Sequence, residues 1–165
     1  MNVSKAIRTK RAVRQYTEES VSDDVIRQIL ATARWSQSSK NTQPWDFFVI
    51  TDKDLLAELS QSGDFAKHLP SAAFAIALVG DSDNYMVGFD LGQTAMSLQL
   101  AAWEVGIGSC LISFHRAEQA AEILGVPEVK YVRIGISFGY PSPEHKAAKM
   151  GGRQALDDIT HWNNW

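Results

Sequence analysis

One segment, residues 85–105, is apolar on most sides of the helix that its composition favours. A helix at the surface of a protein keeps one polar side, so this pattern predicts a helix that is covered almost all round, at the centre of the fold. The segment is a poor candidate for a membrane span, because polar residues interrupt it at Asp90, Gln93, Gln99 and Glu104. We therefore expect the rest of the chain to pack around this helix.

Shorter helical and strand patterns lie on both sides of the central segment. We expect helices over residues 3–10, 22–35, 53–61 and 116–124, and strands over residues 45–50, 73–79, 109–112 and 130–138. Since the two kinds of element alternate, the simplest arrangement is one central sheet with helices on both faces. The 165 residues, 45% of them hydrophobic and 21% charged, suffice for one domain over residues 1–165.

Two of these helices carry signals for where they begin. Ser22 can cap the helix over residues 22–35, and the carboxylates of Asp23 and Asp24 favour its positive end. Paired carboxylates in this position indicate a helix start and not a catalytic pair. The helix over residues 53–61 has either Thr51 or Asp52 as its cap.

The strand over residues 130–138 contains a pattern that resembles a hydrolase motif. Val132, Ile134, Ile136 and Phe138 alternate with other residues, so we expect them on one face of the sheet. Gly135, Ser137 and Gly139 match the G-x-S-x-G nucleophile elbow, which requires a sharp turn at the serine and a helix directly after it. Here the serine lies within the strand and prolines follow, so we do not expect a hydrolase.

Positive charge is concentrated near the N-terminus, although the formal net charge is -3. Five cations fall within ten residues: Lys5, Arg8, Lys10, Arg11 and Arg14. Such a cluster suits a phosphate or another small anion. A lone cluster of this kind is, however, more often a solvated helix face and its exit. No basic face extends over the whole chain, so we expect no nucleic acid partner.

A second polar segment, residues 36–44, links a predicted helix to a predicted strand. Its hydroxyl and amide groups suit a ring with several hydrogen-bonding edges, but loops are also polar simply because they are solvated. The single cysteine, Cys110, lies in an apolar run and is expected to be a small buried side chain. The four histidines are too scattered to suggest a metal site. The N-terminus lacks the apolar core of a signal peptide, so we expect a cytoplasmic protein with no membrane segment.

Several segments, taken in order, resemble the nitroreductase family of flavoproteins. Residues 10–16, with Arg11, Arg14 and Tyr16, resemble the family's N-terminal R-R-S-x-R-x-F/Y signature. Residues 38–47 resemble its P-S-x-x-N-x-Q-P-W-x-F segment, which is the most specific single piece. Residues 90–109 resemble the central helix and the strand after it, and residues 139–141 and 156–162 match as well. The similarity covers nearly the whole chain.

This resemblance implies an α+β fold of three layers, α-β-α, with a central mixed sheet. It further implies that FMN binds without a covalent bond at the interface of a homodimer, and that the long central helix lies in that interface. The C-terminal tail, about residues 144–165, would reach onto the partner subunit, which would explain Trp162 and Trp165 near the chain end.

The family's cofactor-binding positions can be carried over to this sequence. Lys10, Arg11, Ala12 and Arg14 would line the FMN site, with Lys10 or Arg11 at the phosphate and Arg14 at the pyrimidine end of the ring. Ser38, Ser39, Asn41 and, more weakly, Gln43 would contact the flavin of the other subunit. Backbone groups of Ser113 and Phe114 would lie near the reactive N5 edge. Arg153, or alternatively Lys149, would be a second phosphate cation. No catalytic side chain and no metal are expected.

Some positions depart from the family pattern. Ala12 replaces a usual serine and removes a hydroxyl donor, and Lys10 stands where arginine is common, so a forked contact to phosphate becomes a point charge. Gln37 replaces a proline, Ser97 replaces a frequent asparagine, and Gly151 stands where a second basic residue often precedes Arg153. We expect these changes to alter the affinity or potential of FMN without abolishing its binding.

The chemistry that the resemblance implies is hydride transfer from NADH or NADPH to FMN, and then to a nitroaromatic, a quinone or a similar small-molecule electron acceptor. The donor and the acceptor would take turns at one open face of the flavin. An alternative is a flavin-binding carrier or sensor without significant reductase turnover. A third possibility, reductive cleavage of a halogenated or aromatic ligand, is disfavoured because residues 62–85 contain no large insertion.

Overall fold

A computed structural model describes residues 1–146 and 152–165 of the chain. Its centre is a four-stranded sheet in the order β1-β2-β4-β3. The strands are β1 (Trp45–Ile50), β2 (Phe74–Gly80), β3 (Gly108–Ser113) and β4 (Tyr131–Gly139), and each neighbouring pair is antiparallel. Every strand expected from the sequence is present, with bounds that differ by one residue at most.

The expectation of a mixed sheet is wrong for these four strands. Among the described residues, parallel pairing is confined to an isolated bridge between Ala12 and Ser109. Because β2 and β3 are both antiparallel to β4, they run parallel to each other, and a long helix connects them. The crossover that an alternating sequence suggests is therefore present, but β4 lies between the two strands that it joins.

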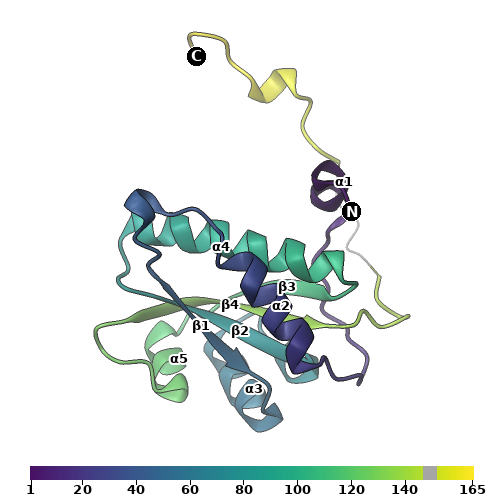
Figure 1. The fold of residues 1–165 in the computed structure, drawn as a ribbon, viewed down its shortest axis with the longest axis vertical. Coiled ribbons are helices and arrows are strands. Elements are labelled where there is room, and N and C mark those ends of the chain that lie inside the picture. The colour runs from purple at the N-terminus through teal and green to yellow at the C-terminus, as the bar shows by residue number, and fades with distance from the viewer. Residues whose placement is uncertain (147–151) are drawn as a thin grey trace.

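The described residues form five α-helices, which are α1 (Val3–Thr9), α2 (Asp23–Ala33), α3 (Lys53–Leu59), α4 (Tyr85–Glu104) and α5 (Ala117–Leu124). Four of them cover the sheet, while α1 lies beyond the end of the longest helix, α4 (Figure 1). Helices α2 and α4 lie on one face of the sheet, and α3 and α5 lie on the other. The chain is thus α+β with three layers, α-β-α, and this part of the expected fold is confirmed.

Each face of the sheet has its own apolar core. On the side of α2 and α4, Phe74 and Phe138 from adjacent strands stack with ring centroids 4.7 Å apart. On the side of α3 and α5, Leu56 and Phe114 are among the fully buried side chains. All seven residues of β2 are buried, because helices cover both faces of this inner strand.

Strand β4 does not keep the regular alternation that its sequence suggests. Its pairing with β2 shifts between Leu78 and Val79, so that Ile134 lies opposite Leu78 but Val132 lies opposite Val79. This bulge around Arg133 turns Val132 to the α5 side, while Ile136 and Phe138 pack on the α4 side. The expectation that all four apolar residues share one face is therefore wrong, because an inserted residue reverses the side-chain phase.

Of the two helix caps expected from the sequence, only the one on α3 is confirmed, and the cap of α4 is a residue that was not expected. Asn84 accepts the backbone N–H of Val87 at 3.0 Å and so caps α4. Asp52, and not Thr51, caps α3 by accepting the N–H of Leu55 at 2.9 Å. Ser22 occupies the cap position of α2, but its hydroxyl makes no capping hydrogen bond.

The expectation that the long helix is covered almost all round is wrong within one chain, because α4 is covered by its own chain on one side only. Its inner side packs on the sheet and on α2, whereas Tyr85, Phe89 and Met96 are exposed. In the tail, Trp162 and Trp165 are exposed as well. Within the two described ranges, no helix combines the length and the hydropathy needed to cross a membrane.

Replacement of Gly139 by alanine should destabilise the fold, because Gly139 lets the ring of Tyr16 lie directly on β4. A Cβ at this position would come within 2.8 Å of Cδ1 and 2.9 Å of Cγ of Tyr16. We expect Gly139→Ala to lower the free energy of unfolding by about 1–3 kcal/mol, as measured by urea titration. In a double-mutant cycle with Tyr16→Ala, the combined loss should be smaller than the sum of the single losses. Additive losses would show that the ring is not the obstacle.

Candidate functional site

The segment after α1 is fixed to the edge of the sheet at β3. The backbone N–H of Val13 donates to the carbonyl of Ser109 at 2.9 Å. Tyr16 donates its hydroxyl proton to the carbonyl of Val13 at 2.6 Å, and its oxygen lies 2.8 Å from Oγ of Ser137. Gly108 permits this approach, since a Cβ there would lie 2.7 Å from Cβ of Val13. Residues 10–14 are therefore held on a rigid frame beside β3.

Four of the residues predicted to line the flavin site lie on this fixed segment: the cations Lys10, Arg11 and Arg14, and Ala12, which pairs with Ser109 of β3. Arg11 donates from Nη1 to the carbonyls of Arg8 at 2.7 Å and Lys10 at 2.9 Å, which fixes its guanidinium at the exit of α1. Burial lowers the pKa of Lys10. Among the ion pairs of the described residues, none includes Lys10, Arg11 or Arg14. Cations held near one another without a carboxylate are suited to an external anion.

His68 lies near Arg14, and Cys110 lies near both Arg14 and Lys10. Burial lowers the pKa of His68, and the positive charge of Arg14 lowers it further. Nε2 of His68 is buried and makes no hydrogen bond within the part of the chain that the structure describes. Burial raises the pKa of the Cys110 thiol, against the effect of Arg14 and Lys10, and the side chain is buried as expected. The proximity of His68 to Arg14 was not predicted, because the two residues are far apart along the chain and no motif links them.

Ser113 and Phe114 lie at the end of β3, against the loop that contains His68. Gly63 of that loop is so close that a Cβ would come within 2.7 Å of the carbonyl oxygen of Ser113. The ring of Phe114 is buried, and its backbone N–H donates to the carbonyl of Arg133 at 2.8 Å. Ser113 is exposed. Phe114 can therefore offer a ligand its carbonyl but neither its ring nor its N–H.

The loop that carries the other predicted contacts is held by α4. The backbone N–H of Ser39 donates to Oδ2 of Asp90 at 3.1 Å, and Asp90 is only 3% exposed. The N–H of Gln43 donates to Oγ of Ser38 at 2.9 Å. Lys40, Asn41 and Gln43 have φ values of 52°, 56° and 50°, a left-handed conformation that is uncommon for such residues. Strained backbone of this kind is concentrated at binding sites, because the surroundings must enforce it.

Within one chain, the two predicted groups lie at opposite ends of α4, with the residue 38–43 loop in blue at one end and α1 at the other (Figure 1). Asp90 binds the loop, whereas Trp103 donates from Nε1 to Oγ1 of Thr9 at 3.1 Å next to the cationic segment. The two anchors are thirteen residues apart along the helix, which corresponds to roughly 20 Å. Lys10, Arg14 and Ser113 share one edge of the sheet, but Ser38–Gln43 does not join them.

The tail does not complete the site within one chain either. Arg153 is exposed, and the described tail residues lie apart from the sheet in Figure 1. Lys149, the alternative to Arg153 as the second phosphate cation, and Gly151, which replaces a basic residue of the family pattern, lie outside the described residues.

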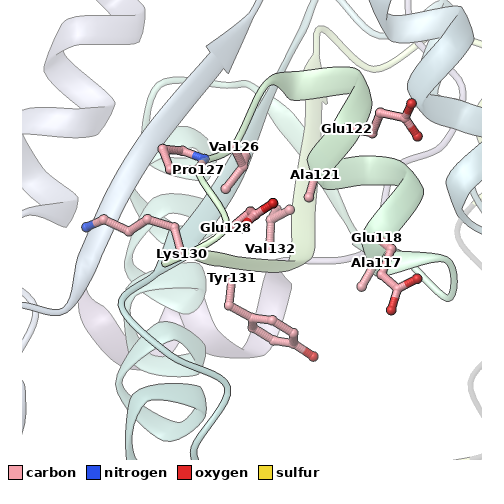
Figure 2. A pocket seen from close by; sticks show the side chains of 10 residues that line it. All are labelled: Ala117, Glu118, Ala121, Glu122, Val126, Pro127, Glu128, Lys130, Tyr131 and Val132. Carbon is pink, nitrogen blue, oxygen red and sulfur yellow. The ribbon is translucent and has the colours of Figure 1, made fainter.

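Neither the hydrolase-like motif nor the hollow beside α5 forms part of the candidate flavin site. Ser137 of the hydrolase-like motif is fully buried within β4, opposite Ala75 and Cys110, so it forms no nucleophile elbow. A hollow of about 440 Å³ lies between α5 and the start of β4 (Figure 2). It is lined by Glu118, Glu122 and Glu128 with one lysine, Lys130, and it contains none of the residues expected to bind flavin. Its carboxylates would repel a phosphate.

The anchor at Tyr16 should make the fold sensitive to high pH. Burial raises the pKa of Tyr16 well above its ordinary value near 10. The folded chain thus keeps the phenol proton, and stability present below about pH 10 is lost as the pH rises and the unfolded chain ionises. We expect Tyr16→Phe to flatten the fall in unfolding free energy between about pH 10 and 12. The matched variant Tyr85→Phe, at an exposed position, should leave the slope unchanged. Equal slopes for both variants would contradict the buried-phenol account.

The comparisons with known proteins agree with this geometry. The sequence profile of the Nitroreductase family matches residues 7–73 and 66–140. A protein of Archaeoglobus fulgidus whose name assigns it as an NADH dehydrogenase/NAD(P)H nitroreductase is 32% identical over 170 residues, covering 98% of this chain and 97% of its own. The structure of an FMN-dependent nitroreductase from Clostridium difficile R20291 has a TM-score of 0.88 and 29% identity, over 99% of this chain and all of the other. The chain belongs to the nitroreductase family of oxidoreductases.

Proposed function

We propose that this protein is an FMN-dependent NAD(P)H oxidoreductase that passes hydride from nicotinamide through the flavin to a nitroaromatic, a quinone or a similar small acceptor. The observation that carries the proposal is the fixed group Lys10, Arg11 and Arg14, which has no carboxylate partner among the described residues. A cofactor with a phosphate at one end and an electron-accepting ring at the other fits this donor set.

Each group of residues has a distinct role in the proposed site. Lys10 and Arg11 hold the phosphate, with Lys10 as a point charge and Arg11 as a fork. Arg14 lies at the pyrimidine end of the ring, where a cation favours the electron-rich reduced state. Ser113 and the carbonyl of Phe114 border the N5 edge. FMN, when bound, supplies the hydride chemistry itself, and the protein positions the ring and sets the charge around it.

A homodimer is the second part of the proposal. The exposed residues Tyr85, Phe89, Gly92 and Met96 follow one another at helical spacing of three or four along α4, and form one apolar stripe. A Cβ at Gly92 would meet nothing within 4 Å, so another helix can approach closely there. Pairing two α4 helices in opposite directions brings the residue 38–43 loop of one chain beside the cationic segment of its partner. The exposed Trp162 and Trp165 of the tail are then available to pack on the partner as well.

The function can be tested with the absorbance spectrum of the purified protein, followed by anaerobic addition of NADH or NADPH. We expect a visible flavin band, retained or restored by added FMN, that bleaches rapidly and returns when a quinone or a nitroaromatic is added. A band that persists with both nucleotides would instead indicate a flavin-binding carrier or sensor. A protein that takes up no FMN would overturn the proposal at its centre.

The shared site can be tested by mixing two defective variants. Arg14→Ala and Asn41→Ala should each lower flavin affinity, because each removes one side of both sites. In a mixed dimer, however, one site combines the intact Arg14 of one chain with the intact Asn41 of the other. After unfolding and refolding together, equal amounts should therefore recover about a quarter of the wild-type bound flavin. Refolding each variant alone is the control. No recovery in the mixture would place both residues in a site within a single chain.

A further inference from the structure

A second hollow, of about 320 Å³, lies where α2 ends and the residue 38–43 loop begins. It is lined by Arg34, Trp35, Ser36, Asn41 and Gln43. Two of these, Asn41 and Gln43, are residues expected to approach the flavin. The other three follow α2 directly, and neither the family resemblance nor the composition of the sequence drew attention to them. The hollow therefore borders the proposed flavin site but has its own chemical groups.

The cation and the aromatic ring in this hollow are both available to a ligand. Trp35 is 80% exposed, and Cζ of Arg34 lies 5.5 Å from the centroid of its ring. No ion pair of the described residues includes Arg34. An indole ring exposed to this degree loses the burial that usually stabilises tryptophan, which favours a role in contact with another molecule.

The exposed ring is held by a rigid backbone. The N–H groups of Arg34, Trp35 and Ser36 donate to the carbonyls at the end of α2, at 3.0, 3.2 and 2.9 Å. Oγ of Ser36 donates to the carbonyl of Ala33 at 2.7 Å and lies 2.8 Å from Oγ of Ser97 on α4. Residues 34–36 are thus hydrogen-bonded to both α2 and α4, so the backbone that carries Arg34 and Trp35 is fixed before a ligand binds. This preorganisation lowers the entropic cost of binding.

An aromatic face, a fork-shaped cation and two amides form the complement of a purine that carries a phosphate. We propose that this hollow binds the adenosine end of NADPH, with the purine stacked on Trp35 and the 2′-phosphate paired with Arg34. Guanidinium groups bind phosphate through two parallel hydrogen bonds, and they are specific for it for that reason. Asn41 and Gln43 face the sugar and the purine edge. The inference rests on the proposed function, since it concerns the hydride donor, and it makes NADPH the preferred donor over NADH.

The site itself can be tested by calorimetry on the full-length protein, with adenosine 2′,5′-bisphosphate and adenosine 5′-monophosphate as probes. We expect the bisphosphate to bind at least about tenfold more tightly, because a hydrogen bond to a charged group contributes this much. Arg34→Ala should abolish the difference, and Arg34→Lys should restore part of it. Arg27→Ala removes the same charge from α2 away from the hollow and should leave the difference intact. Equal affinity of the wild-type protein for both probes would overturn the proposal.

The consequence for the donor can be measured by anaerobic stopped-flow reduction of the bound flavin. Arg34→Ala should lower the ratio of the NADPH rate constant to the NADH rate constant at subsaturating nucleotide about tenfold, mainly through NADPH, without changing the flavin content. Trp35→Leu should weaken both nucleotides alike. An unchanged ratio in Arg34→Ala would refute the inference, and so would a Trp35→Leu variant that loses only its dimeric state. If neither nucleotide reduces the flavin while the bisphosphate still binds through Arg34, the reductase function fails and the nucleotide site stands.

Discussion

The structure depends on the one-sided burial of α4. This 20-residue helix is apolar on most sides, and a single chain covers only the side that faces the sheet and α2. Removing apolar surface from water contributes roughly 25 cal/mol for each Å², so an uncovered stripe of aromatic and aliphatic side chains strongly favours association. The proposed dimer follows from the same pattern that places α4 at the centre of the fold. One side of α4 forms part of the core, and the opposite side forms the proposed interface.

The two groups of candidate ligands are positioned by this helix from its two ends. Near its start, Asp90 holds the N–H of Ser39 and keeps the strained residue 38–43 loop in place. Near its end, Trp103 binds Thr9, from which the chain turns into the cationic segment beside β3. The rigid length of α4 prevents the groups from meeting within one chain. It also sets the spacing at which they would meet across a two-fold axis.

Much of the fold could be predicted, because the period of apolar residues records which elements are buried. The strand Trp45–Ile50 and the long helix were found almost to the residue. The insertion of β4 between β2 and β3 could not be found in this way, since periodicity does not specify neighbours. The bulge at Arg133 could not be predicted either, because the apolar residues of β4 alternate in the sequence whether or not a residue is inserted in the strand pairing. For the site, motifs identified the cations and the polar loop, but the proximity of His68 to Arg14 is a product of tertiary packing.

The bond between Asp90 and Ser39 has a consequence for thermodynamic linkage. Asp90 belongs to the helix proposed as the interface, and it also holds the loop that would bind flavin. The flavin-binding loop and the partner-binding surface of the helix are therefore parts of one rigid unit. Under the proposed assembly, cofactor binding and subunit association are then coupled equilibria, and each raises the apparent affinity of the other by the same factor. Dilution of the protein would release flavin, and saturation with flavin would hold the subunits together, as mass action requires.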